Sequence, residues 1–278
     1  DTVPVFRYNQ YYKQKKIMNK TDFFYLLYKL YGPVTRARNT FFYTKKGVRL
    51  TDCYQENGRA ILGWEGGSAF TYFKNTLSRG QVGSFITEDH SRLKKAVTEL
   101  LASNRNIHFF SKKLDALKAG LALSPEKTAV FRPWANTQTN WPEVDCLVLN
   151  PPLPWTDTVF ILPTKEELKT DKEKLANTIE LPYALQAALT RAIYNLIKAL
   201  QEREEKDWFI YDPVLTKYFK RKGPYLYPKI PQEKYDDFLL HCLKLGIVFN
   251  PDYREYSIVP FGADKGVFTK LKNSPFIY

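Results

Sequence analysis

The chain has 278 residues, which is enough for one large domain or two smaller ones with a full hydrophobic core. Its 44% hydrophobic and 26% charged residues are ordinary for a soluble globular protein, and no apolar run approaches the roughly 20 residues that span a bilayer. The first residues lack the basic and apolar regions of a signal peptide, and three widely spaced cysteines argue against a disulfide framework or a zinc site. We therefore expect a cytoplasmic protein with no membrane segment.

The formal net charge of +13 favours an anionic partner such as nucleic acid, a membrane surface or a phosphorylated ligand. The lysines and arginines are spread along the chain, and no run of like charge is longer than Lys13-Gln-Lys-Lys16. A basic but solvated surface explains this distribution as simply as a binding site does.

Aromatic residues are interleaved with lysines through residues 1–31. Thr21-Asp22 could cap a helix from about Phe23 to Tyr31, which Gly32-Pro33 would stop. Such a pattern suits stacking on nucleic acid, but it equally suits an arm that packs on its own domain or on a twin subunit.

The next segment predicts two short strands, Phe41–Tyr43 and Val48–Leu50, joined by a turn at Lys45–Gly47. Gly63–Ser68 is glycine-rich but lacks the spacing of a nucleotide-binding loop, so we expect a flexible connector there. Apolar residues at helical spacing predict an amphipathic helix over Ser91–Leu101.

Asn106–Phe110 is typical of a strand, and Ser111–Leu123 of a helix with Ser111 as its N-cap. A helix start with free N–H groups, a hydroxyl and the neighbouring Lys112 suits a bound phosphate, although an ordinary N-cap needs no ligand. A further strand, Thr128–Arg132, is ended by Pro133-Trp134.

The run Val144–Leu149 has the length of a buried strand and stops at Asn150-Pro-Pro, because proline cannot continue a ladder. This turn would leave the Asn150 side chain at the carboxyl edge of a sheet, where α/β proteins bind ligands. The order of helices and strands predicts an α/β domain with a largely parallel sheet.

After this turn we expect a strand at Val159–Leu162 and a helix that starts at Lys165. Leu181–Leu200 predicts a long and largely buried helix. A second helix, Tyr235–Leu245, should be closed by Gly246 as its C′ residue. Strands are then expected at Ile247–Phe249 and Tyr256–Val259.

Three stretches together resemble class III aminotransferases, which are pyridoxal phosphate (PLP) enzymes. The first, Arg36–Gly63, has the order basic residue, strand, turn glycine, strand, Asp and Leu-Gly. The second, Asn150–Thr156, is similar to the family's Asn-Pro turn. The third, Leu245–Pro260, contains Leu-Gly-Ile, Asn-Pro-x-Tyr and Ser-Ile-Val-Pro. The resemblance implies an α/β chain of the PLP-dependent transferase type (fold type I), with a reduced central sheet domain plus a small α+β domain built from both termini. We expect an N-terminal arm and part of the small domain at 1–60, the central domain at 61–180, and the long helix with the rest of the small domain at 181–278.

The same resemblance implies a site and an assembly. In the family, the strand-to-helix turn holds the cofactor phosphate and the Asn of the Asn-Pro turn binds the phenolic oxygen. Ser111, Lys112, Asn150 and Trp134 are therefore the expected cofactor-binding residues, and Arg254 is the nearest candidate for binding a substrate carboxylate. Members dimerise, which makes a homodimer the expected assembly.

Transamination also needs a lysine for the internal Schiff base and an acid for the pyridine nitrogen. The interval Thr158–Glu180 offers only the lysines of a charge-rich segment, which are Lys165, Lys169, Lys172 and Lys174. We therefore expect a degenerate protein without standard transamination. It would hold no cofactor, or would bind PLP or another phosphorylated or anionic ligand non-covalently.

Two alternatives stay open. Asn150-Pro-Pro-Leu also resembles the motif of S-adenosylmethionine-dependent amino-methyltransferases, with Trp155 near the aromatic position and Ile61–Gly67 as a loose counterpart of the cofactor loop. The basic charge alternatively suits a nucleic-acid-binding protein without enzymatic activity. The three histidines are isolated and suggest no hydrolytic triad.

Overall fold

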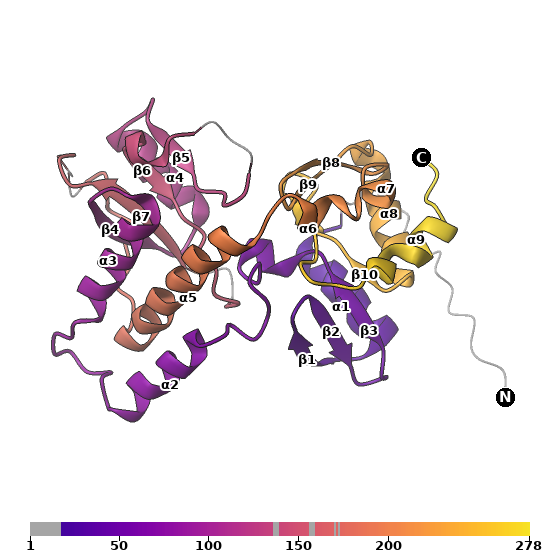
Figure 1. The fold of residues 1–278 in the computed structure, drawn as a ribbon, viewed down its shortest axis with the longest axis horizontal. Helices are drawn as coiled ribbons and strands as arrows, with labels where there is room; N and C mark the ends of the chain where they lie inside the picture. Colours follow the sequence, from indigo (N-terminus) through magenta and orange to yellow (C-terminus); the bar gives the residue numbers. More distant parts are fainter. Residues whose placement is uncertain (1–17, 136–138, 156–158, 170, 172) are drawn as a thin grey trace.

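The computed structural model describes residues 18–135, 139–155, 159–169, 171 and 173–278. These residues form two lobes, drawn on the left and the right of Figure 1. The expected N-terminal arm falls largely on residues 1–17, which lie outside the described residues. Within the described chain, no helix has the length and apolar character needed to cross a membrane.

The larger lobe is built on a four-stranded sheet in the order β4 (Arg105–Phe110), β7 (Phe160–Lys165), β6 (Cys146–Val148) and β5 (Thr128–Val130). Strands β5 and β6 are parallel, whereas β7 is antiparallel to both of its neighbours, so β4, β5 and β6 run in one direction. Two of the three strand pairings are antiparallel, so the sheet is mixed and the expectation of a largely parallel sheet was wrong, because β7 is inserted between β4 and β6 in the opposite direction.

Helices cover both faces of this sheet (Figure 1). On one face lies α4 (Lys113–Leu123), whose alanines pack with Phe110, Val148 and Leu162. On the other, alternate strand residues such as Ile107 pack with α3 (Asp89–Leu101) and α5 (Tyr183–Glu202), and α2 (Ala69–Ser78) packs on α5. The expected boundary at residue 181 lies just before α5, whose buried side belongs to this lobe.

The smaller lobe contains two sheets. The first has the order β1 (Val34–Arg38), β2 (Phe41–Thr44), β3 (Arg49–Asp52) and β10 (Ile247–Val248), and the second the order β11 (Ser257–Ile258), β9 (Tyr225–Pro228) and β8 (Phe219–Lys222). The helices of this lobe are α1 (Lys20–Tyr31), α6 (Lys206–Phe209), α7 (Asp212–Leu215), α8 (Gln232–Lys244) and α9 (Thr269–Asn273).

Strand β10 pairs in parallel with β3, and the Cys53 N–H donates to the Val248 carbonyl at 2.8 Å. A segment near the C-terminus thus completes a sheet begun near the N-terminus, and the expected small domain built from both ends of the chain is confirmed. Gly246 follows α8 with φ +83° and donates to the Leu243 carbonyl, as predicted for a C′ glycine.

Three local predictions were wrong. Lys165 does not start a helix but ends β7, because it continues the ladder opposite Arg105; residues 166–168 form a turn. Ser111 is not the N-cap of α4, since Lys112 occupies that position in an extended conformation. Helix α1 begins at Lys20, before the expected Phe23, because the Asn19 side chain caps it by accepting from the Asp22 N–H.

Candidate functional site

The carboxyl ends of β5 and β6 meet the start of α4 at the junction between the two lobes. Asn150, which follows β6, lies at this edge together with Lys113 of α4, as the sequence predicted for Asn150. From the smaller lobe, Asn57, Glu255 and Tyr256 approach the same point. These groups, with Val130, Val148 and Phe160, enclose a cavity of about 50 Å³.

A left-handed turn carries Asn57 to the junction. Gln55, Glu56 and Asn57 have φ values of 46°, 46° and 54°, a conformation that costs L-residues roughly 1–2 kcal/mol each. The buried Asp52 carboxylate fixes the start of this turn by accepting from the Tyr54 and Gln55 N–H groups at 2.9 and 3.0 Å. Strained backbone of this kind persists only where its surroundings hold it.

Three asparagines connect the lobes through this turn. The Asn150 Nδ2 donates to the Asn57 carbonyl at 2.7 Å, and the Asn250 Nδ2 donates to the Asn57 Oδ1 at 2.9 Å. The Asn250 Nδ2 also donates to the Tyr256 carbonyl at 2.9 Å. Asn150 Oδ1 is buried and finds no hydrogen-bond partner among the described residues. The donor end of the Asn150 side chain therefore holds the turn, and its acceptor end stays without a partner.

The cations of the junction are engaged by protein groups. Lys113 Nζ pairs with Glu255 Oε1 of the other lobe at 2.6 Å. Arg59 is buried; its Nη2 donates to the Val159 carbonyl and its guanidinium lies over the Phe160 ring. Arg203 Nη1 donates to the Ile61 carbonyl at 2.8 Å, and burial lowers the pKa of this arginine to about 10. Each of these contacts ties chain segments together across or beside the junction.

The other expected site residues lie away from the cavity. Ser111 and Lys112 are exposed before α4. Trp134 has φ 60° and packs edge-on against Trp208 of the smaller lobe. Arg254 is exposed in the turn before β11, and its neighbour Glu255 lines the cavity instead.

Pyridoxal phosphate does not fit this junction as it stands. The cavity has room for one or two waters, whereas ligand pockets typically measure about 300–1,000 Å³. Residues 149–159, between β6 and β7, include no lysine. Lys165 lies at the opposite edge of the sheet and pairs with Asp145 at 3.4 Å, and Lys169 and Lys174 are exposed. The fourth candidate, Lys172, lies outside the described residues.

The methyltransferase motif lacks its expected setting. Residues 61–67 form successive turns that follow η2 (Gln55–Gly58), rather than a loop at the end of a strand. Within the motif around Asn150, Leu153 is buried at the place of the aromatic residue, and Trp155 packs against Phe73 of α2. The described geometry therefore provides neither the cofactor loop nor an open stacking surface beside Asn150.

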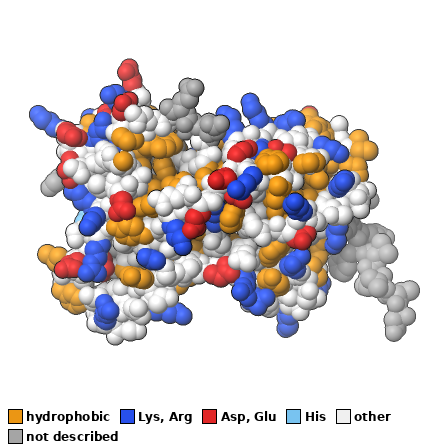
Figure 2. Space-filling view, in the orientation of Figure 1, with side chains coloured by type: hydrophobic (Ala, Val, Ile, Leu, Met, Phe, Trp, Pro, Cys, Tyr) orange, Lys and Arg blue, Asp and Glu red, His pale blue; other side chains and the backbone are white. Residues whose placement is uncertain are grey.

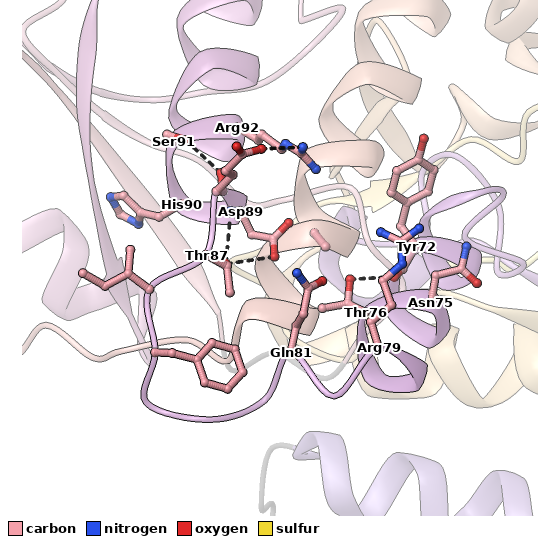
Figure 3. A pocket seen from close by; sticks show the side chains of 14 residues that line it. Tyr72, Asn75, Thr76, Arg79, Gln81, Thr87, Asp89, His90, Ser91 and Arg92 are labelled. Atoms are coloured by element: carbon pink, nitrogen blue, oxygen red, sulfur yellow. Dashed lines mark hydrogen bonds and ion pairs between the residues drawn. The ribbon is translucent and has the colours of Figure 1, made fainter.

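A second and larger hollow, of about 910 Å³, lies between α2, the following loop and the start of α3 (Figure 3). On the α2 side, the hollow is lined by Tyr72, Thr76 and Arg79. On the opposite side, at the start of α3, it is lined by Thr87 and Asp89, and the Thr87 hydroxyl lies 3.0 Å from the Asp89 carboxylate. Its rim carries exposed apolar side chains: Phe85 is 53% and Ile86 94% exposed. The local sequence carries no binding motif that predicts this surface, since its lining is brought together from α2, the following loop, α3 and Ala187 of α5.

No protein-family model matches the chain. Among curated proteins, it is 24% identical over 278 residues to an uncharacterised protein of Treponema pallidum (83% of this chain, 89% of the relative). It is also 24% identical over 255 residues to an uncharacterised protein of Borreliella burgdorferi (87% of this chain, 90% of the relative).

Among solved structures, the acetylornithine aminotransferase of Elizabethkingia anophelis matches with a TM-score of 0.61 and 10% identity, covering 92% of this chain and 98% of the other. The ornithine aminotransferase of Plasmodium yoelii matches with a TM-score of 0.61 and 12% identity (92% and 97%). A serine palmitoyltransferase of S. paucimobilis with a bound PLP adduct matches with a TM-score of 0.61 and 10% identity (91% and 95%). The chain therefore has the fold of PLP-dependent transferases of fold type I.

Proposed function

We propose that this chain is a degenerate member of the aminotransferase fold that does not carry out transamination. In its place, the lobe junction serves to hold the two halves of the protein together. The resulting rigid body would act through its surfaces rather than through a bound cofactor.

The observation that carries this proposal is the state of the lysines around Asn150. The short connection from β6 to β7 has none, and the lysine that lines the cavity, Lys113, is ion-paired with Glu255. A Schiff-base lysine must be free to attack a carbonyl, whereas Lys113 Nζ is held 2.6 Å from the Glu255 carboxylate of the other lobe. The small cavity likewise supports a closed junction.

The test is titration of the purified protein with PLP, followed by borohydride reduction and peptide mass analysis. We expect no reduced adduct on a lysine of the junction, and Lys113→Met serves as the control that removes the nearest one. An adduct on Lys113 that forms with a saturable change in visible absorption would overturn the proposal. A saturable spectral change without an adduct would instead indicate non-covalent PLP binding, and would contradict the closed junction.

We further propose that the chain forms a homodimer through the surface around the α2–α3 hollow. In a two-fold symmetric dimer each subunit contributes the same surface to the interface. A side chain that projects from one subunit can therefore enter a hollow on the other only if that surface contains both the projection and the hollow. The exposed Ile86 and Phe85 project beside the 910 Å³ hollow that their own loop lines, which meets this condition. Exposed apolar clusters of this kind are unusual on monomers.

Light scattering after gel filtration tests the dimer. We expect twice the mass of one chain for the native protein and one chain for Ile86→Asp. Leu114→Asp on α4 is the matched control, because Leu114 is also exposed but lies outside this surface. A native protein with the mass of one chain at micromolar concentration would contradict the homodimer.

A further inference from the structure

The positive charge of the protein is concentrated near its N-terminus. The first 68 residues hold 12 of the 42 lysines and arginines but only 5 of the 29 acidic residues, which gives +7 of the net +13. Figure 2 shows Lys and Arg side chains gathered over the lower part of the smaller lobe, where Figure 1 draws β1, β2 and β3. Five of these twelve cations, Arg36, Arg38, Lys45, Lys46 and Arg49, belong to β1, β3 and the turn that joins β2 to β3, so this sheet carries a basic surface.

One face of that sheet combines arginines with aromatic rings. In the strand register, Arg36 of β1 lies opposite Tyr43 of β2, which lies opposite Arg49 of β3. Two residues along, Arg38 lies opposite Phe41. Because side chains alternate between the two faces of a strand, these five residues share one face, which we call the arginine–aromatic face.

The arginines of this face lie over its rings. The Arg36 guanidinium is 4.3 Å from the centroid of Tyr43, and that of Arg49 is 4.6 Å from the centroid of Phe41. Arg38 pairs with Glu65 at 3.3 Å, but among the described residues neither Arg36 nor Arg49 has an acidic partner. Both are exposed, so their charge is available to an external anion.

Protection of a sheet edge explains only part of this arrangement. Strand β1 is an edge strand, and charged residues on edge strands prevent pairing with other chains. Arg49, however, belongs to β3, an inner strand that pairs with β2 along its length and with β10 at Thr51 and Asp52. Edge protection also gives no reason for Phe41 and Tyr43 to lie half-exposed beneath the arginines.

We propose that the arginine–aromatic face binds single-stranded nucleic acid. Neighbouring strands lie about 4.8 Å apart, so Arg36 and Arg49 project on either side of Tyr43 with roughly 10 Å between their backbones. Arginines at that separation can neutralise nearby phosphates of one strand while unpaired bases stack on the guanidinium planes or on the rings. The broad face of a four-stranded sheet favours a single strand, because duplex grooves are entered by a projecting helix or a two-stranded ribbon. This binding is independent of the chemistry at the lobe junction.

The test measures fluorescence anisotropy of labelled oligothymidylate and oligouridylate with the full-length protein. We expect Arg36→Glu combined with Arg49→Glu to weaken binding by at least about tenfold, with a salt slope smaller by about 1.4 for two lost phosphate contacts. Tyr43→Leu should weaken binding about tenfold through lost stacking. The matched control, Lys220→Glu with Lys222→Glu, changes the net charge equally at exposed positions on β8, and should weaken binding less than threefold, a change of about 0.6 kcal/mol in binding free energy.

Circular dichroism establishes that each variant is folded before it is compared. An equal loss of affinity in the β8 control would show attraction by bulk charge and overturn the assignment to this face. So would native protein that binds no oligonucleotide, or that binds a duplex of the same length as tightly. If the β1 and β3 variants lose binding to phosphatidylserine vesicles but keep their affinity for oligonucleotides, the face is a membrane-binding surface and the proposal is wrong.

Discussion

The lobe junction and the arginine–aromatic face both contain cationic side chains, but these side chains have different surroundings in the two regions. At the junction, Arg59, Arg203 and Lys113 are each engaged by a carbonyl, a ring or a carboxylate of the protein itself. On the face, Arg36 and Arg49 lie over aromatic rings and are open to solvent. At the junction the cations bind groups of the protein and hold the lobes together, whereas on the face the guanidinium groups stay accessible to an external anion.

This difference separates stability from binding. Changes at the junction should lower the free energy of unfolding and leave oligonucleotide affinity unchanged, because no side chain of the junction belongs to the arginine–aromatic face. Changes on the arginine–aromatic face should weaken oligonucleotide binding and have little effect on the free energy of unfolding. The three predictions below test that separation.

The largest effect is expected from the pH dependence of Asp52. Burial raises the pKa of this carboxyl to about 7, against about 3.9 in an unfolded chain. The folded protein therefore binds the proton more tightly, so this contribution to stability is fully present below about pH 4 and is lost as pH rises through about 7. The difference is on the order of 4 kcal/mol in the free energy of unfolding.

Denaturant unfolding across this pH range measures the effect, and Asp52→Asn is the comparison because it cannot titrate. The native protein should lose stability between about pH 4 and about pH 7 relative to the variant. A parallel pH dependence in both proteins would show that Asp52 titrates near its ordinary pKa. Asp52 holds the turn that carries Asn57, so loss of the turn would also appear as a weaker junction.

The second prediction concerns Asn250, which is 1% exposed. Its side chain donates to Asn57 and to Tyr256, and accepts from the Asp252 N–H at 3.0 Å. Asn250→Ala removes three buried hydrogen bonds, so the free energy of unfolding should fall by about 3 kcal/mol. The control is Asn273→Ala, an exposed position at the end of α9, with a change within about 0.5 kcal/mol. Equal stability of both variants would mean that the asparagine network does not hold the lobes.

The fold could be predicted from the sequence where local signals agreed with the final contacts. Gly246 after an amphipathic helix predicted the end of α8, and a short apolar run before Asn150-Pro-Pro predicted both β6 and the edge at which Asn150 lies. The resemblance of the two ends to one family correctly predicted that they join in one small domain, and the pairing of β3 with β10 is how they do so. The first two features depend on residues close together in the chain, whereas the third came from the family resemblance alone.

The site could not be predicted in the same way, because its contacts join distant residues. Asn57 and Asn250 are 193 positions apart, and Lys113 and Glu255 are 142 apart. Nothing in the local sequence indicates that three non-glycine residues, 55–57, adopt left-handed backbone, since Asp52 and the opposite lobe impose it. The helix predicted to start at Lys165 is wrong for a related reason: the local sequence Lys-Glu-Glu-Leu is typical of a helix start, whereas the residue that pairs with Lys165, Arg105, is remote in the chain.

The third prediction has the smallest effect on stability. Arg36→Gln removes an exposed cation–π contact with Tyr43, which is worth about 0.5–1 kcal/mol in the free energy of unfolding. The same variant should weaken oligonucleotide binding severalfold, because it deletes one phosphate contact and reduces the salt slope by about 0.7. Asn250→Ala measured beside it should show the opposite pattern, with large destabilisation and unchanged affinity below its unfolding transition. If Arg36→Gln instead destabilised the protein by as much as Asn250→Ala, this arginine would be part of the structural core of its lobe, and the distinction between a junction that holds and a face that binds would fail.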